Sequence, residues 1–201
     1  QINGEKVGEA DNMFRTWEFD IKKYLKDGLN HIRIVFGSTI PYIRERALRR
    51  KVWHTGIGQE RIEDSNQIRK MQCNYGWDWG PKLVTCGIWK RIEIQAYDEV
   101  KIEDLHVIQE HRDNRVILNA AAELSRKPSK PLEGSLKLFF RDEAVYETKW
   151  EIAEKETSIS FEVPEPKLWW PNNMGPQNLY RVVFTVKSDA GLLDKVEKNI
   201  G

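Results

Sequence analysis

Two tryptophans flank a carboxylate at Trp77, Asp78 and Trp79, and these residue types together suit the binding of a sugar. Aromatic rings stack on the apolar face of a pyranose, while a carboxylate accepts directed hydrogen bonds from its hydroxyl groups. Gly76 precedes the triplet and Gly80-Pro81 follows it, and these residue types turn the chain. The stretch therefore predicts a loop that presents an acid and two indole rings to a ligand.

A plainer interpretation of the same triplet is an ordinary strand. In a strand the two indole rings would share one face and the acid would occupy the other. That arrangement describes two core tryptophans and a solvated aspartate. The spacing alone favours the strand, whereas the flanking glycines and proline favour the loop, so both interpretations stay open at this stage.

Other reactive residue types lack the spacing that their chemistry requires. The four histidines fall into no metal-ligand pattern, and we expect no metal and no cofactor. Acidic residues mostly alternate with lysine and arginine on predicted strands, and no carboxylate pair is placed as glycoside cleavage requires. We therefore assign no catalytic residue. Cys73 and Cys86 could form a disulfide across a hairpin, but we favour free thiols.

The composition is that of a globular protein with no polyanionic partner. The chain has 201 residues, 40% hydrophobic and 31% charged, with 32 basic and 31 acidic side chains. A basic run at 44–51 could contact nucleic acid, but a solvated helix face is favoured. No apolar run is long enough to span a membrane. No signal peptide is visible and a cytoplasmic location is favoured, although both chain ends lie inside apparent strands and suggest part of a longer protein.

Periodicity predicts an all-β chain with one helix, at residues 40–53. Asn3-Gly4 marks a hairpin turn, and alternating apolar residues predict strands at 32–36, 67–77 and 82–97. The pattern restarts near residue 98, which predicts domains at 1–98 and 99–201. The second domain shows seven short strand patterns, as in an immunoglobulin-like sandwich, and these cover 102–110, 115–124, 134–142, 144–152, 157–165, 179–188 and 192–200.

The residues around the tryptophan triplet resemble the signature of β-mannosidases in glycoside hydrolase family 2. Those enzymes carry a Gln-x-x-x-Gly-Trp-Asp-Trp-Gly-Pro run followed by Gly-Ile-Trp. This chain matches the run at Gln72 and Gly76–Pro81, and the tripeptide at Gly87–Trp89. Asn12–Arg15 resembles the Asn-Met-Phe-Arg segment of the same enzymes.

A second motif of the family is similar to Leu168–Tyr180, which reads "LWWPNNMGPQNLY". The family pattern is Leu-Trp-x-Pro-Asn-Gly-x-Gly followed by Leu-Tyr. Two residues depart from it. Asn173 stands where glycine is usual, and asparagine also tolerates a left-handed backbone. Asn178 stands where proline is common.

The resemblance implies a galactose-binding-like jelly roll, an immunoglobulin-like sandwich and a catalytic barrel, in that order. Residues 1–98 would be the jelly roll without its first strands, and residues 99–201 the sandwich. The two catalytic glutamates of the retaining mechanism would lie on the barrel. The implied partner is a β-mannoside oligosaccharide, whose terminal mannose Asp78 would bind while Trp77 and Trp79 shape the pocket wall.

Two other functions remain as alternatives. A stand-alone pair of carbohydrate-binding modules would bind sugar without a barrel and would have intact chain ends. The same two domains also occur in β-galactosidases and β-glucuronidases of family 2. The Trp-Asp-Trp-Gly-Pro run favours the mannosidase branch over these.

Overall fold

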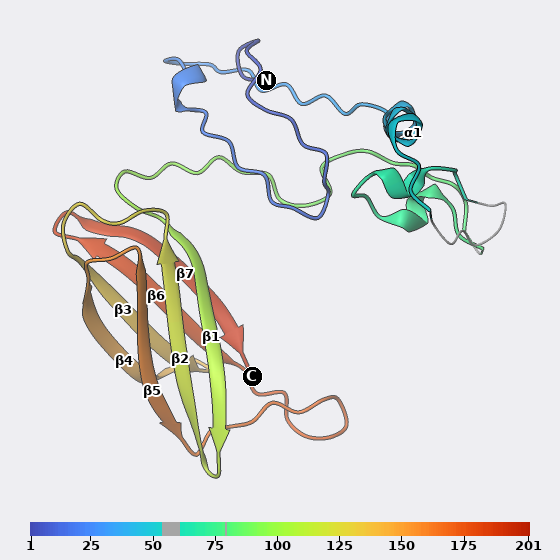
Figure 1. Ribbon diagram of the computed structural model, residues 1–201. Coiled ribbons are helices and arrows are strands. Elements are labelled where there is room, and N and C mark those ends of the chain that lie inside the picture. The colour runs from blue at the N-terminus through green and yellow to red at the C-terminus, as the bar shows by residue number, and fades with distance from the viewer. Residues whose placement is uncertain (54–60, 79) are drawn as a thin grey trace. The chain divides into compact units, whose positions relative to one another are not determined.

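The computed structural model describes residues 1–53, 61–78 and 80–201. These residues form two compact units, Gln1–Glu93 and Ile94–Gly201, which are drawn in Figure 1. The predicted division into domains at 1–98 and 99–201 stays a prediction.

Seven antiparallel strands build the second unit, and all seven coincide with predicted strand patterns. One sheet has the order β1-β2-β5 and the other β4-β3-β6-β7, as Figure 1 shows. This is the two-sheet arrangement of an immunoglobulin-like sandwich, so the predicted all-β fold class is confirmed. The bounds are β1 Ile102–Arg112, β2 Arg115–Leu124, β3 Leu132–Phe140, β4 Glu143–Ile152, β5 Glu156–Pro164, β6 Tyr180–Ser188 and β7 Gly191–Ile200.

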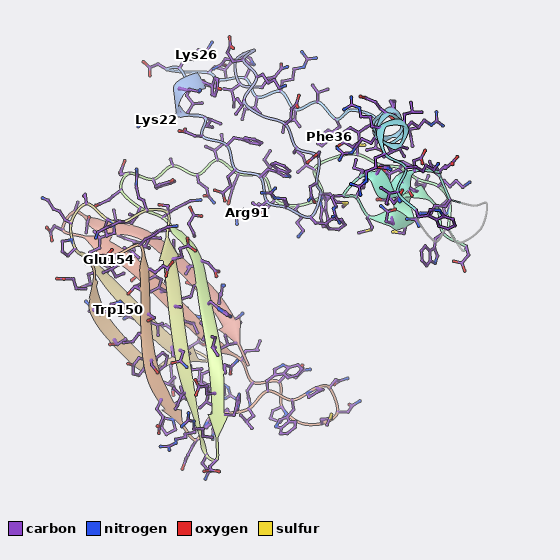
Figure 2. All side chains as sticks on the ribbon, in the orientation of Figure 1. Lys22, Lys26, Phe36, Arg91, Trp150 and Glu154 are labelled. Atoms are coloured by element: carbon purple, nitrogen blue, oxygen red, sulfur yellow. The ribbon has the colours of Figure 1, made fainter. Side chains whose placement is uncertain are left out.

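The core of the sandwich lies between the two sheets. Tyr146 of β4 stacks on Phe161 of β5 with ring centroids 4.0 Å apart. Trp150 of β4, labelled in Figure 2, donates from Nε1 to Thr157 Oγ1 of β5 at 2.7 Å. Because β4 and β5 belong to different sheets, these contacts close one side of the sandwich. The N–H of this partly buried indole therefore has a hydrogen-bond acceptor, which avoids a desolvation penalty.

Polar contacts close the opposite side, between β1 and β7. The Asp194 carboxylate accepts a hydrogen bond from the Ile102 backbone N–H at 2.7 Å. Lys198 Nζ lies 3.0 Å from Asp104 Oδ1 and also donates to the Leu105 carbonyl. The hydrogen bond from Lys198 lowers the pKa of the Asp104 carboxyl. Strands more than 90 residues apart in sequence are thereby tied together.

The described residues of the first unit form one α-helix and three single-turn 3-10 helices. They are η1 Lys22–Tyr24, α1 Thr39–Arg49, η2 Ser65–Gln67 and η3 Gln72–Tyr75. The predicted helix at 40–53 is thus present, and it ends at Arg49. Pro41 lies in its first turn, where the backbone N–H has no intrahelical acceptor and its loss carries no penalty. The helix buries Ile43 completely.

The strands predicted in the first unit do not pair into a sheet among its described residues. Asn3 and Gly4 form the expected turn, with positive φ at both and an antiparallel bridge between Ile2 and Glu5. Segments 32–36 and 82–97 contain no regular strand, and Phe36, labelled in Figure 2, is half exposed. The prediction of strands was wrong here because alternation marks an apolar face but supplies no neighbour for the backbone groups.

Candidate functional site

Asp78 lies at the tip of a tight turn. The Gly80 N–H donates to the Trp77 carbonyl at 3.3 Å, and an isolated antiparallel bridge joins the same two residues. The Asp78 side chain is exposed and Trp77 is partly buried. Trp79, the third predicted site residue, lies outside the described residues. For Asp78 the geometry matches the predicted loop and excludes the mid-strand alternative.

The Asp78 carboxylate faces water. Among the described residues, no side chain or backbone donor forms a hydrogen bond with it. A structural aspartate in a turn usually caps a backbone N–H two residues later, as Asp20 does for Lys22 at 3.0 Å in this chain. Asp78 has no such role, so both of its oxygens can accept hydrogen bonds from a ligand.

Gly76 sets the direction in which the chain enters this turn. Its backbone has φ 123° and ψ 145°, a region that only glycine adopts without strain. Its N–H donates to the Cys73 carbonyl at 3.3 Å and so ends η3. A side chain at this position would change the angle between η3 and Trp77.

Tyr75 anchors the turn to the rest of the first unit. Its ring is completely buried, and its hydroxyl donates to Thr39 Oγ1 at 2.8 Å, at the start of α1. Burial raises the pKa of the Tyr75 hydroxyl. The Tyr75 carbonyl accepts from the Ile62 N–H at 2.7 Å. The residue just before the glycine is therefore fixed by both its side chain and its backbone.

Gln72 holds the other end of η3, and every contact of its amide is internal. Its Nε2 donates to the carbonyls of Ser65 at 2.9 Å and Lys70 at 3.1 Å, while its Oε1 accepts from Arg61. A glutamate at position 72 would lack the two N–H donors, and a leucine would lack all three hydrogen bonds. Gln72 therefore fixes the start of η3, the single-turn helix that leads into the turn. Sequence reasoning matched Gln72 to a motif but did not find this role, because the partners are brought together only by the fold.

The Asn12–Arg15 segment packs beside the stretch that leads into η3. Asn12 and Arg69 form a parallel bridge, and the Met13 N–H donates to the Arg69 carbonyl at 3.0 Å. The Met71 N–H lies 2.9 Å from Met13 Sδ, across 58 residues of sequence. The structure thus brings together two of the segments on which the resemblance rests.

The residue types in this arrangement suit the binding of a ligand. An exposed acid beside a partly buried indole can hold a polyhydroxylated ligand, and the described residues contain no cluster of three or more His, Cys, Asp and Glu side chains that could hold a metal ion. Cys73 and Cys86 are free thiols, as predicted, and both are exposed. Within the described chain, no helix has the length and apolar character needed to cross a membrane.

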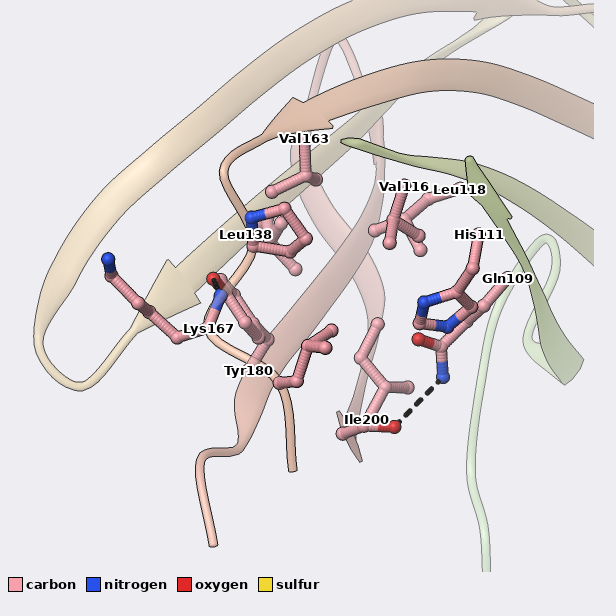
Figure 3. A pocket seen from close by; sticks show the side chains of 12 residues that line it. Gln109, His111, Val116, Leu118, Leu138, Val163, Lys167, Tyr180 and Ile200 are labelled. Atoms are coloured by element: carbon pink, nitrogen blue, oxygen red, sulfur yellow. Dashed lines mark hydrogen bonds between the residues drawn. The ribbon is translucent and has the colours of Figure 1, made fainter. Parts of the chain in front are cut away.

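The sandwich contains a cavity that is too small to be a sugar site. It lies at the end of the two sheets near Gly201, between Gln109, Leu138 and Tyr180, as Figure 3 shows. Its volume is about 30 Å³, enough for one or two waters and far below the roughly 300 Å³ of a small ligand pocket.

The second motif forms a hairpin, Leu168–Leu179, which we call the aromatic hairpin. Trp169 and Gln177 form an antiparallel bridge, and the Trp170 N–H donates to the Pro176 carbonyl at 3.0 Å. Asn173 has φ 66°, the left-handed conformation expected where the family has glycine. Asn178 Nδ2 donates to the Leu168 carbonyl at 3.0 Å, so the asparagine closes the base of the hairpin.

Family models and relatives match both units. Residues 1–90 match the model described as glycosyl hydrolase 2 galactose-binding domain-like, and residues 100–201 match glycosyl hydrolases family 2. The whole chain is 30% identical to β-mannosidase B of Emericella nidulans and of Aspergillus terreus, and it covers 24% of each. The crystal structure of β-D-mannosidase from Dictyoglomus thermophilum matches the whole chain with a TM-score of 0.85 and 29% identity, over 25% of that protein.

Proposed function

The chain belongs to glycosyl hydrolase family 2, and from that premise we propose that it is the non-catalytic N-terminal part of a retaining β-mannosidase, here called the parent enzyme. In this proposal the parent removes terminal β-linked mannose. The chain contributes the turn around Asp78 to the substrate pocket. Residues outside 1–201 supply the two catalytic glutamates.

One observation carries the proposal: the exposed Asp78 turn is held by hydrogen bonds of Gln72 and Tyr75 inside a chain that resembles β-mannosidases over its whole length. The relatives named above are β-mannosidases, and the chain spans about a quarter of their length. Gln72 and Tyr75 fix the turn, while the acid at its tip bonds to nothing in the described chain. A rigid support beneath a free acceptor is the arrangement that a binding site requires.

Asp78 acts as a hydrogen-bond acceptor for the hydroxyl groups of the terminal sugar. Hydrogen bonds to a carboxylate are roughly twice as strong as neutral ones, particularly when water is excluded. Trp77 and Trp79 exclude that water and form the pocket wall. The acid takes no part in bond cleavage, because a retaining glycosidase uses a separate pair of carboxyl groups about 5–5.5 Å apart.

The test is Asp78→Asn in the parent enzyme, assayed on an aryl β-mannoside. The amide keeps the shape of the acid but loses its charge, which costs about 2–3 kcal/mol of transition-state binding. This corresponds to a decrease of about 30- to 150-fold in kcat/KM. The free energy of unfolding should change by less than about 1 kcal/mol.

Asp113→Asn is the matched control, because Asp113 is also an exposed aspartate in a turn, with φ 43° between β1 and β2. Asparagine tolerates that backbone, so the control should retain wild-type kinetics. Unchanged kcat/KM in Asp78→Asn together with lowered stability would refute the sugar-binding role.

The 201-residue chain alone should not hydrolyse aryl β-mannosides under conditions where the parent does. If the purified chain turns over the substrate, the assignment of both glutamates outside it is wrong. Tight binding of mannoside oligosaccharides by the isolated chain would instead favour the stand-alone binding-module alternative.

A further inference from the structure

The aromatic hairpin exposes more apolar surface than a solvated turn requires. Five apolar side chains on its twelve residues are each 41–68% exposed, namely Leu168, Trp169, Trp170, Met174 and Leu179. The hairpin carries no charged residue, although 31% of the chain is charged. Protein interfaces are depleted of charge in their centre and enriched in tryptophan and methionine. This composition is typical of a surface that another protein surface covers.

The hairpin is held in one conformation before any partner binds. Trp170 packs directly on Gly175, where an added Cβ would lie 2.8 Å from the indole ring. The base is closed by the Asn178 side chain, and the Lys167 N–H donates to the Tyr180 hydroxyl at 2.9 Å. A preorganised aromatic surface loses little conformational entropy on binding, so these residues suit a stable contact.

Gly201 lies at the base of the hairpin. A Cβ on Gly201 would come within 2.9 Å of Leu179 Cδ2 and Trp169 Cβ. Its carbonyl accepts from Gln109 Nε2 at 3.3 Å, as the dashed line in Figure 3 shows. In a longer protein, the polypeptide after residue 201 therefore starts in contact with Trp169 and Leu179.

We propose that the aromatic hairpin is the docking surface for the catalytic domain that follows residue 201 in the parent enzyme. The inference rests on the proposed function, which supplies that domain as the occupant. Trp169, Trp170 and Met174 pack into it. The hairpin thereby fixes the orientation of the immunoglobulin-like sandwich relative to the domain that performs the chemistry.

Thiol reactivity at the tip of the hairpin tests this docking directly. Met174→Cys is introduced into a Cys73→Ser, Cys86→Ser background, which removes the two exposed native thiols. Met174 is 68% exposed, so the substitution removes little packing in the 201-residue chain. The alkylation rate with a maleimide is then measured in that chain and in the parent. We expect it to be at least tenfold slower in the parent.

Val145→Cys in the same background is the matched control, since Val145 is an exposed apolar residue on β4, outside the hairpin. Its rate should differ less than twofold between the two proteins. Equal rates at residue 174 in chain and parent would overturn the proposal. A rate in the isolated chain that falls with protein concentration would also overturn it, because the occupant would then be a second copy.

Hydrogen exchange is a second measurement, made on the chain and the parent without any substitution, so it does not depend on the Met174→Cys variant. Hydrogen exchange at the hairpin amides, including the Trp170 N–H, should slow in the parent. None of these readouts uses activity. A parent that covers residue 174 but does not cleave β-mannosides would refute the proposed function alone, and an active parent with an exposed residue 174 would refute the docking alone.

Discussion

Gly76 and Gly80 flank the predicted sugar-binding residues, and replacing each with alanine should have opposite effects. Gly76 has φ 123° and ψ 145°, where a side chain costs about 1–3 kcal/mol. An alanine also reduces the entropy of the unfolded chain, which offsets about 0.4–1 kcal/mol. We therefore expect Gly76→Ala to destabilise the first unit by about 1–2 kcal/mol.

Gly80 is the control position. Its φ is not in the left-handed region, and an added Cβ would meet no atom of the described residues within 4 Å. Only the unfolded-state effect remains, so Gly80→Ala should be neutral or stabilise by up to about 1 kcal/mol. The two variants make the same chemical change four residues apart, at positions whose backbone conformations differ.

Hydrogen exchange at Ile62 measures the difference. The Ile62 N–H donates to the Tyr75 carbonyl, next to Gly76, so its protection reports whether that contact stays closed. A loss of 1–2 kcal/mol corresponds to roughly 5- to 30-fold faster exchange in Gly76→Ala. Protection in Gly80→Ala should be unchanged or higher. Equal exchange in both variants would refute the claim that the Gly76 conformation supports the turn.

Two further predictions concern the sandwich. Asp104 has a lowered pKa because Lys198 donates a hydrogen bond to it. Its contribution to the free energy of unfolding is therefore present above the unfolded pKa of about 4, and it is lost as the pH falls through the folded pKa. The pair is exposed, so Asp104→Asn should cost less than about 1 kcal/mol at pH 7. In urea unfolding that difference should disappear on acidification, and a difference that grows at low pH would contradict the assignment. Trp150→Phe removes the hydrogen bond to Thr157 and should cost about 1–2 kcal/mol; a double variant with Thr157→Val should lose less than the sum of the single losses, and full additivity would show that the two side chains are not coupled.

The sandwich could be predicted from sequence because each strand has a local pattern of alternating apolar residues that ends at a turn. In β2, buried residues alternate with less buried ones, and each such strand is separated from the next by a turn signal. The register of every strand is then fixed by its buried face. Helix α1 was predicted for a similar reason, since its composition favours a helix whatever lies next to it.

The first unit depends on contacts that no local pattern encodes. Segment 82–97 alternates like a strand, yet no strand of the described chain pairs with it, and Ile92 and Ile94 remain exposed. The support of the Asp78 turn is equally non-local. Gln72 meets Arg61 and Ser65, and Met13 meets Met71 across 58 residues. Spacing indicated the turn itself, because Gly76 and Gly80 lie in the sequence beside it, but it could not indicate what holds the turn.

The departures from the family motif show what the aromatic hairpin requires. Asn173 adopts φ 66°, so the position needs a residue that tolerates a left-handed backbone, and asparagine meets that need at a small cost. Asn178 replaces the conformational restriction of a proline with a hydrogen bond to Leu168, which proline could not donate. Both changes keep the hairpin closed and leave Trp169, Trp170 and Met174 exposed. The shape that presents these side chains is therefore maintained by different chemistry, as expected if the hairpin is the proposed docking surface.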